Sequence, residues 1–360
     1  VLVVAEGKLP SLGRLTAPMI VVQDVLVALE RLGVAARARS GARIIAVTGS
    51  AGKTTTKEAL RHVLSAVGTV HASAQSFNNH WGVPLTLARM PESCDYAVFE
   101  IGMNHPGEVR PLVKMVRPHV AIVTLIAAAH LGFFRNLDEI AQAKAEIFEG
   151  LEPDGAALLN RDDSRWKLLD KMAKAAGVEH VYSFGENARS TFRLVKCELN
   201  ADHSVIAVKI DGREILARVG APGRHMVQNV LAVLGAAQLV GADLGKVASA
   251  LADLSAERGR GKRHILRHPK GPITLIDESY NANPASMAAA MALLNATPVS
   301  GEGRRIAVLG DMLELGSHSA KLHAALAELI IGTGTQTVFL GGPEMRALAE
   351  ILPSDVKTEY

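Results

Sequence analysis

The sequence predicts an α/β protein whose core is a mostly parallel sheet covered by helices. Short aliphatic runs alternate with helical patterns from residue 44 onward, which is typical of successive βαβ units. Hydrophobic residues make up 48% of the chain and aromatic residues only 4%, so the apolar content is aliphatic, as in buried parallel sheets. A chain of 360 residues is long enough for two or three domains.

The first strand candidates are aliphatic runs separated by helical patterns, at residues 44–48, 96–101, 120–125, 156–160 and 180–184. Residues 191–219 alternate apolar and polar side chains, with Asp211-Gly212 as a hairpin turn between the last two runs. We therefore expect an antiparallel patch in the same domain. Two helices are predicted to follow, at about 225–241 and 244–254.

The Gly/Arg-rich segment 257–263 is the best candidate for a linker. Beyond it, a second and smaller α/β unit is predicted from strands at 273–277, 305–309 and 337–340, with helices between them. The stretch 258–267 is locally basic. A solvated hinge is the favoured interpretation over RNA contact, because the formal net charge of +3 is weak and dispersed.

Residues 1–40 hold one strand, one turn and one helix, which is too little for an independent core. The apolar start lacks the basic region of a signal peptide and resembles an internal strand, so we expect a fragment whose N-terminal domain is truncated. The C-terminal unit also ends after few strands, so we expect it to be truncated. Cys94 and Cys197 lie far apart, which suggests a reducing, cytoplasmic compartment. We expect a monomer that binds neither membrane nor nucleic acid.

The most informative motif is TGSAGKTTTK at residues 48–57, between an aliphatic run and a helical pattern. Strand, glycine loop and helix are the context of a phosphate-binding loop. Gly49 and Gly52 allow the backbone to wrap an anion, Lys53 would neutralise phosphates, and the Thr54 hydroxyl would bind magnesium. Val47 stands where the standard spacing has glycine, so the loop is shortened. The predicted nucleotide-binding residues here are Gly49, Ser50, Ala51, Gly52, Lys53, Thr54 and Thr55.

Other polar residues lie just past predicted strands, where ligands bind in open α/β sheets. Glu100 ends a buried strand and is a candidate magnesium ligand, with helix capping as the alternative. His130 follows the strand at 120–125 and is either a functional or a structural histidine. Asn78 and Asn79 are candidates for contacts to a substrate, although turn formation explains them nearly as well.

Two further features lie on helices. Lys144 is in an alanine-rich helical stretch, where a lysine is usually a solvated surface residue. In the loop 277–284, Pro284 fits the first turn of a helix and Asn283 can cap it. The loop contains more polar residues than one cap requires, so we treat it as part of a site.

Four motifs resemble, in order and spacing, those of the Mur ligase family, the ATP-dependent amide-forming ligases of peptidoglycan precursor synthesis. They are TGSAGKTTTK, FNNHWGVPLTL, ESYNANPASM and LGDMLELG. The last three are most similar to the branch that adds D-alanyl-D-alanine to UDP-N-acetylmuramoyl-tripeptide. The resemblance implies an acyl-phosphate mechanism with ATP and Mg²⁺. Another Mur ligase, a folylpolyglutamate synthase and a non-catalytic nucleotide-binding module remain the alternatives.

The resemblance implies roles for single residues. Thr54, Glu100 and His130 match metal ligands, and Lys144 matches a lysine that is carbamylated in relatives and helps to hold a second magnesium. Lys53, Lys144 and His130 are the expected catalytic residues. The other matches are Asn229 and Asn281 near the adenine, Arg260 at the ATP phosphates, and Asn78, Asn79 and Asn283 at the substrate.

The resemblance also implies a domain organisation. Residues 1–40 would be the remnant of a domain that binds the UDP end of the substrate, residues 41–262 a central P-loop ATPase domain, and residues 263–360 a Rossmann-like domain. Leu125 stands where the family commonly has asparagine, so the loop that carries His130 is atypical.

Overall fold

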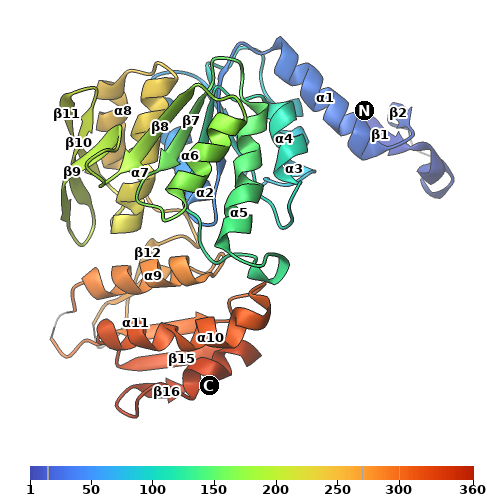
Figure 1. Ribbon diagram of the computed structural model, residues 1–360. Helices are drawn as coiled ribbons and strands as arrows, with labels where there is room; N and C mark the ends of the chain where they lie inside the picture. The colour runs from blue at the N-terminus through green and yellow to red at the C-terminus, as the bar shows by residue number, and fades with distance from the viewer. Residues whose placement is uncertain (14–15, 270, 300) are drawn as a thin grey trace.

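The computed structural model describes residues 1–13, 16–269, 271–299 and 301–360. Figure 1 shows a large central α/β unit, an N-terminal arm that extends to one side, and a smaller C-terminal α/β unit below. None of the described helices is both long enough and apolar enough to cross a membrane.

A single nine-stranded sheet forms the middle of the central unit, and its strand order is β11-β10-β9-β8-β7-β6-β3-β5-β4. Strands from β4 to β9 run parallel to their neighbours, whereas β10 is antiparallel to both β9 and β11. The predicted parallel sheet with an antiparallel patch is therefore confirmed. The strands are β3 (Arg43–Thr48), β4 (Val70–Ala72), β5 (Tyr96–Glu100), β6 (Val120–Val123), β7 (Ala156–Asn160), β8 (His180–Gly185), β9 (Phe192–Leu199), β10 (Ser204–Ile210) and β11 (Arg213–Val219).

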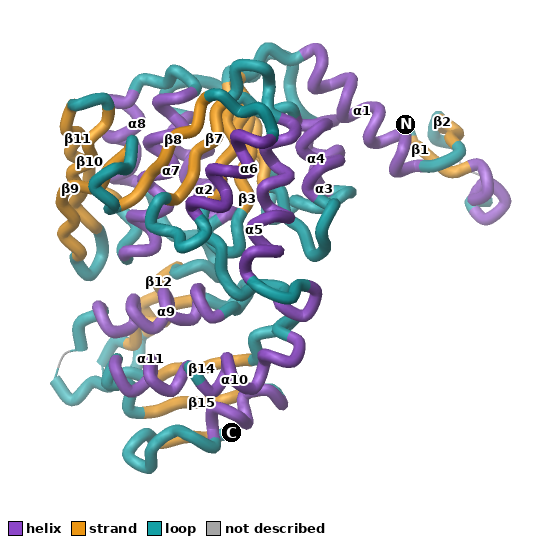
Figure 2. The backbone as a smooth tube through the Cα atoms, viewed as in Figure 1, coloured by secondary structure: helices purple, strands orange, loops and turns teal. Residues whose placement is uncertain are grey.

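Helices cover both faces of this sheet, as Figure 2 shows. Successive side chains of a strand point to opposite faces, so Ile45 and Val47 of β3 join one hydrophobic cluster while Ile44 and Ala46 join the other. Burial on both faces explains why the strands are aliphatic throughout and not alternating. The helices on the first face are α2 (Lys53–Leu64), α7 (Arg224–Leu239) and α8 (Leu244–Ala250), and those on the second are α3 (Gly82–Ala88), α4 (Val109–Val116), α5 (Leu137–Ala145) and α6 (Trp166–Ala175).

The hairpin between β10 and β11 turns at the two residues that the sequence indicated. Ile210 pairs with Arg213 across the turn. Asp211 has φ 48° and Gly212 has φ 79°, so both occupy the left-handed region that a two-residue hairpin turn requires. Local turn chemistry therefore sets the register of the antiparallel edge.

The N-terminal arm contains one strand more than expected. β1 (Leu2–Ala5) pairs in parallel with β2 (Met19–Val22), and α1 (Val25–Arg39) follows. Asp24 caps α1 by accepting hydrogen bonds from the backbone N–H groups of Leu26 and Val27. The sequence did not separate β2 from the helix, because only two residues lie between them.

The C-terminal unit begins with an antiparallel pair, β12 (Lys262–Leu266) and β13 (Ile273–Asp277). Half of the basic segment 258–267 is therefore a strand and not an irregular hinge. The three predicted strands of this unit are present. Its other elements are α9 (Pro284–Ala296), the parallel strands β14 (Ile306–Gly310), β15 (Thr337–Gly341) and β16 (Lys357–Glu359), and the helices α10 (Ser319–Ala324), α11 (Leu326–Gly332) and α12 (Arg346–Ala349).

Burial predicts which leucines stabilise the central unit. Leu231 of α7 is fully buried, whereas Leu216 of β11 is 71% exposed. Leu231→Ala should lower the free energy of unfolding by about 2–5 kcal/mol, because it leaves a cavity in the core. Leu216→Ala should lower it by less than about 1 kcal/mol. Urea denaturation measures both values, and equal losses would contradict this description of the core.

Candidate functional site

The predicted phosphate loop connects β3 to α2, and its two glycines lie too close to neighbouring side chains to be replaced. A Cβ on Gly49, which has φ 151°, would lie 1.9 Å from the hydroxyl oxygen of Thr124. A Cβ on Gly52, which has φ 83°, would lie 2.5 Å from Oδ1 of Asn229. Val47 is fully buried in β3. In a loop of standard length, residue 47 would be the first glycine; here it is a buried strand residue, so the phosphate loop is shorter.

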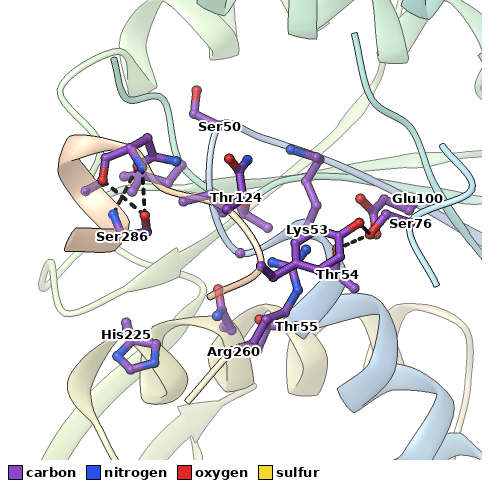
Figure 3. A pocket seen from close by; sticks show the side chains of 18 of the residues that line it. Ser50, Lys53, Thr54, Thr55, Ser76, Glu100, Thr124, His225, Arg260 and Ser286 are labelled. Carbon is purple, nitrogen blue, oxygen red and sulfur yellow. Dashed lines mark hydrogen bonds between the residues drawn. The ribbon is translucent and has the colours of Figure 1, made fainter. Parts of the chain in front are cut away.

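The loop opens into a cavity of about 440 Å³ that residues of both the central and the C-terminal units line. Figure 3 shows the side chains around it. Most of the predicted site residues meet here: Ser50, Ala51, Gly52, Lys53, Thr54, Thr55, Asn78, Glu100, His130, Asn229, Arg260, Asn281 and Asn283.

Three predicted residues do not line this cavity. Gly49 packs against Thr124. The side-chain oxygen of Asn79 accepts hydrogen bonds from the backbone N–H groups of Trp81 and Gly82, at 3.1 and 2.9 Å, at the start of α3. Turn formation, the alternative considered for Asn79, therefore describes its contacts. Lys144 is buried in α5.

Lys53 and Glu100 are the central charges of the cavity. The Lys53 ammonium donates to the carbonyl oxygen of Gly49 at 2.8 Å, so it lies over the phosphate loop. Burial lowers the pKa of Lys53, the Glu100 carboxylate opposes this, and Arg260 adds to it. These charges therefore act on one another at the mouth of the loop.

Glu100 is only 1% exposed at the end of β5. Its Oε1 accepts a hydrogen bond of 2.7 Å from the side-chain amide of Asn78. Its Oε2 is buried and has no hydrogen-bond partner in the described part of the chain. It caps no described helix, since α4 begins at Val109 with Glu108 as its N-cap. A buried carboxylate oxygen without a partner is unfavourable unless a ligand binds it.

The expectation that Lys144 is a solvated surface residue is wrong. The side chain is 1% exposed, and its ammonium has no hydrogen bond or ion pair to any described residue. Burial lowers the pKa of Lys144 well below its ordinary value, and the positive charge of Lys53 lowers it further. The site thus disfavours a positive charge at this position. Lys144 lies one turn after Ile140, on the side of α5 that also buries Ala141 and Ala145.

His130 has a left-handed backbone with φ 61° and lies beside the C-terminal unit. Its Nδ1 pairs with a carboxylate oxygen of Glu314, in the LGDMLELG motif. The N–H of Gly132 donates to the carbonyl oxygen of Glu314 at 2.8 Å. Burial lowers the pKa of His130, Glu314 opposes the shift, and Lys144 and Lys53 add to it. Two motifs far apart in the sequence are therefore in direct contact.

The loop 277–284 makes a second contact across the cavity. The hydroxyl of Tyr280 donates to the Ser76 hydroxyl oxygen at 2.7 Å, and Ser76 lies 3.5 Å from the hydroxyl oxygen of Thr54. The Arg260 guanidinium lies 4.3 Å from the centre of the Tyr280 ring. Figure 3 shows Arg260, Thr54 and Ser76 around the same opening. No pattern in the sequence indicated Ser76.

The asparagines of this loop have local partners. Asn283 caps α9, as predicted, through a reciprocal pair of hydrogen bonds with Ser286 of 3.0 and 2.9 Å. The side-chain oxygen of Asn281 accepts from the backbone N–H of Ala282 at 2.9 Å. In both residues the oxygen is engaged locally, and the amide N–H groups remain for a ligand.

Glu278 is a further cavity residue that the sequence did not distinguish from its neighbour. The carboxylate of Asp277 accepts hydrogen bonds from Gly259 and Ser279, which lower its pKa. Glu278 lines the cavity, where burial raises the pKa of its carboxyl to about 7; Arg260 opposes this shift and Asp277 adds to it. The pKa values of these two adjacent acids thus shift in opposite directions, because Glu278 is buried in the cavity whereas Asp277 accepts hydrogen bonds.

The raised pKa of Glu278 predicts a pH-dependent stability. Between the ordinary value of 4.5 and about 7, the unfolded chain loses this proton while the folded protein keeps it, so stability falls as pH rises. The free energy of unfolding of Glu278→Gln should therefore increase by about 1–2 kcal/mol relative to that of the wild type between pH 5 and pH 8. Urea unfolding at both pH values measures this gain. The exposed Glu302→Gln variant is the control, and an equal effect in both variants would contradict the assignment.

Comparison with known proteins agrees with this arrangement. Residues 47–237 match the Mur ligase middle domain, and residues 262–359 match the Mur ligase glutamate ligase domain. The UDP-N-acetylmuramoyl-tripeptide--D-alanyl-D-alanine ligase of Rickettsia prowazekii (strain Madrid E) is 33% identical over 342 residues, which cover 95% of this chain and 75% of the relative. The ligase of the same name from Escherichia coli (strain K12) is 35% identical over 333 residues, or 92% and 72% of the two chains.

A crystal structure of MurF from Acinetobacter baumannii has the same fold. Its TM-score is 0.86 at 31% sequence identity, and the match covers 96% of this chain and 74% of that one. Two matching domains, relatives above 30% identity over most of the chain, and this structural similarity lead to one conclusion. The chain belongs to the Mur ligase family.

Proposed function

We propose that this protein is an ATP-dependent ligase that adds D-alanyl-D-alanine to UDP-N-acetylmuramoyl-tripeptide through an acyl phosphate. The observation that carries the proposal is one cavity that joins Lys53 of the phosphate loop, the partly unpartnered carboxylate of Glu100, and the SYNANP loop of the C-terminal unit. Relatives that match most of the chain carry the name of this activity. The reaction would take place in the cytoplasm, with the enzyme as a monomer.

The nucleotide would lie along the phosphate loop and the start of α2. Backbone N–H groups at a helix N-terminus bind phosphate, and Lys53 adds a positive charge beside them. Asn229 and Asn281 would contact the adenine, and Arg260 the phosphates. All three line the same cavity as the loop.

Mg²⁺ would be held by Thr54, Glu100, His130 and a carbamate on Lys144. The buried Oε2 of Glu100 needs a partner, and oxygen donors suit magnesium. Glu314 engages Nδ1 of His130, which leaves Nε2 of the ring for a ligand. When bound, magnesium would offset the negative charge between the phosphates and the acceptor carboxylate.

The carbamate follows from the environment of Lys144. The carbamate would supply a second acidic ligand beside Glu100. An uncharged lysine amine can attack carbon dioxide; a C–N bond forms and a proton is released. The product is an anion, which Lys53 would attract, whereas Lys53 disfavours the lysine cation.

The chain's own groups would then assist both chemical steps. Transfer of the γ-phosphoryl group from ATP to the acceptor carboxylate forms the acyl phosphate, and Lys53 would offset charge between the two anions. The incoming amine adds to the acyl carbon, phosphate leaves, and the ammonium proton is released. Contacts of Tyr280 with Ser76 and of Glu314 with His130 would hold the C-terminal unit over the cavity and exclude water.

We also propose the domain division that this chemistry requires. Residues 41–262 would bind ATP and the acceptor carboxylate, and residues 263–360 would bind the amine. Residues 1–40 would belong to the part that holds the UDP end of the acceptor. Asn78 and Asn283 would contact the substrates at the cavity. Asn79 would hold the loop that carries Asn78 in place through its hydrogen bond with Gly82 at the start of α3.

The substrate assignment predicts which amine supports ATP consumption. Phosphate release with UDP-N-acetylmuramoyl-tripeptide should require D-alanyl-D-alanine, because neutral amides line the cavity and, among the described lining residues, Arg260 has no second arginine beside it to bind the carboxylate of a single amino acid. D-glutamate, diaminopimelate and L-alanine, offered separately at equal concentration, should not support it. Equal use of any one of them would assign the protein to another branch of the family.

The carbamate predicts a chemical rescue. Lys144→Ala should lower kcat by at least about a hundredfold, because it removes the proposed carboxylate at the metal. Formate, acetate or propionate should restore part of the activity. The matched control is Lys174→Ala, since Lys174 lies on the surface of α6. An alanine variant with normal turnover would remove Lys144 from the site.

A further inference from the structure

A second buried lysine, Lys57, has no role in the chemistry above. It lies on α2 one turn after Thr54, and its side chain is fully buried. Its ammonium donates to the carbonyl oxygens of Ser73 and Gln75, at 2.7 and 2.6 Å. It also lies 2.5 Å from a carboxylate oxygen of Glu58. All three directions in which an ammonium donates are therefore used.

The two carbonyls belong to the 73–79 loop, which connects β4 to the start of α3. Gln75 has a left-handed backbone with φ 48°, so the loop is held in a conformation that this residue does not favour. The Ser73 hydroxyl oxygen accepts from the backbone N–H of Glu100 at 3.3 Å. Lys57 thus bonds the loop on both sides of Ala74, at the point where it turns toward the cavity.

The remainder of the 73–79 loop reaches the proposed reaction site. Ser76 and Asn78 line the cavity. Ser76 contacts Thr54 and Tyr280, and Asn78 donates to Glu100. On a helix, residues three apart lie on the same face, so Thr54 and Lys57 present one surface to this loop.

We propose that Lys57 is a positioning residue that fixes the 73–79 loop against α2, so that Ser76 and Asn78 are presented to the acceptor substrate in register with the phosphate loop. This role rests on the proposed function for the identity of the acceptor, but not for the position of the loop. A buried ammonium must keep its hydrogen-bond partners, because an unpaired buried charge is strongly unfavourable. The loop is thereby coupled to the helix that begins at the phosphates.

A purely structural role would give a different result. If Lys57 only stabilised the fold, its removal would lower the fraction of folded protein and so weaken the apparent binding of ADP and of the acceptor equally. As a positioning residue it should affect the loop and the acceptor selectively. The binding of ADP in the presence of EDTA reports on the phosphate loop without a contribution from the metal ligands. This measurement therefore separates a purely structural role of Lys57 from a positioning role.

The test compares Lys57→Met with Arg61→Met in the complete chain. Arg61 lies one turn further along α2, is 51% exposed and also pairs with Glu58, but it does not contact the loop. Losing hydrogen bonds to a charged group should accelerate amide exchange at residues 74–80 about tenfold or more and raise the KM for UDP-N-acetylmuramoyl-tripeptide about tenfold. The Kd for ADP should change less than about threefold. Arg61→Met should resemble the wild type.

Lys57→Arg keeps a cation with several donors. It should therefore restore part of the protection of residues 74–80 from amide exchange and bring the KM for the acceptor part of the way back to the wild-type value. It also provides the measurement if Lys57→Met does not fold. Unchanged exchange in the loop, or parallel losses of ADP and acceptor binding, would overturn the proposal. If the wild type does not use the acceptor, the proposed function fails, whereas the exchange of residues 74–80 still decides whether Lys57 positions the loop.

Discussion

Charge buried beneath the phosphate loop is the constraint on which the site depends. Lys144 is 1% exposed and Lys53 lines the cavity, and the positive charge of Lys53 disfavours a second cation at Lys144. Glu100 acts in the other direction, since its carboxylate supports the charged form of Lys53. The fold therefore disfavours a positive charge at Lys144, whereas Glu100 supports the positive charge of Lys53. This difference gives the two lysines separate proposed roles, although the charge of one acts on the other.

The order of the strands brings these groups together. β6, β3 and β5 are neighbours in the sheet, and their carboxyl ends meet at one edge. β3 leads into the phosphate loop, β5 ends at Glu100, and the segment after β6 carries His130. The C-terminal unit then adds Tyr280 and Glu314 from the opposite side. The cavity thus forms where the segments after these strands meet α7 and the 277–284 loop.

Much of this architecture was predictable from the sequence, because the signals are local. Aliphatic runs fixed the strands of the parallel sheet, since burial on both faces leaves few polar positions. Asp211-Gly212 indicated a hairpin because few residue pairs adopt two left-handed backbones. The glycines and Lys53 of the phosphate loop were also recognisable, because they stand close together in the sequence. Asn283 was expected to cap α9, and its contacts with Ser286 follow from that local preference.

The sequence by itself determined the fold class, the phosphate loop and the turns, because each depends on neighbouring residues. Only the tertiary structure decided the state of long polar side chains. Lys144 and Lys57 both lie on helices where lysine is ordinarily exposed, and packing against distant elements buries them. Packing likewise left Glu278 with a raised pKa while Asp277 was hydrogen-bonded. Burial and the distribution of charge arise from contacts between residues far apart in the chain, and no local pattern encodes them.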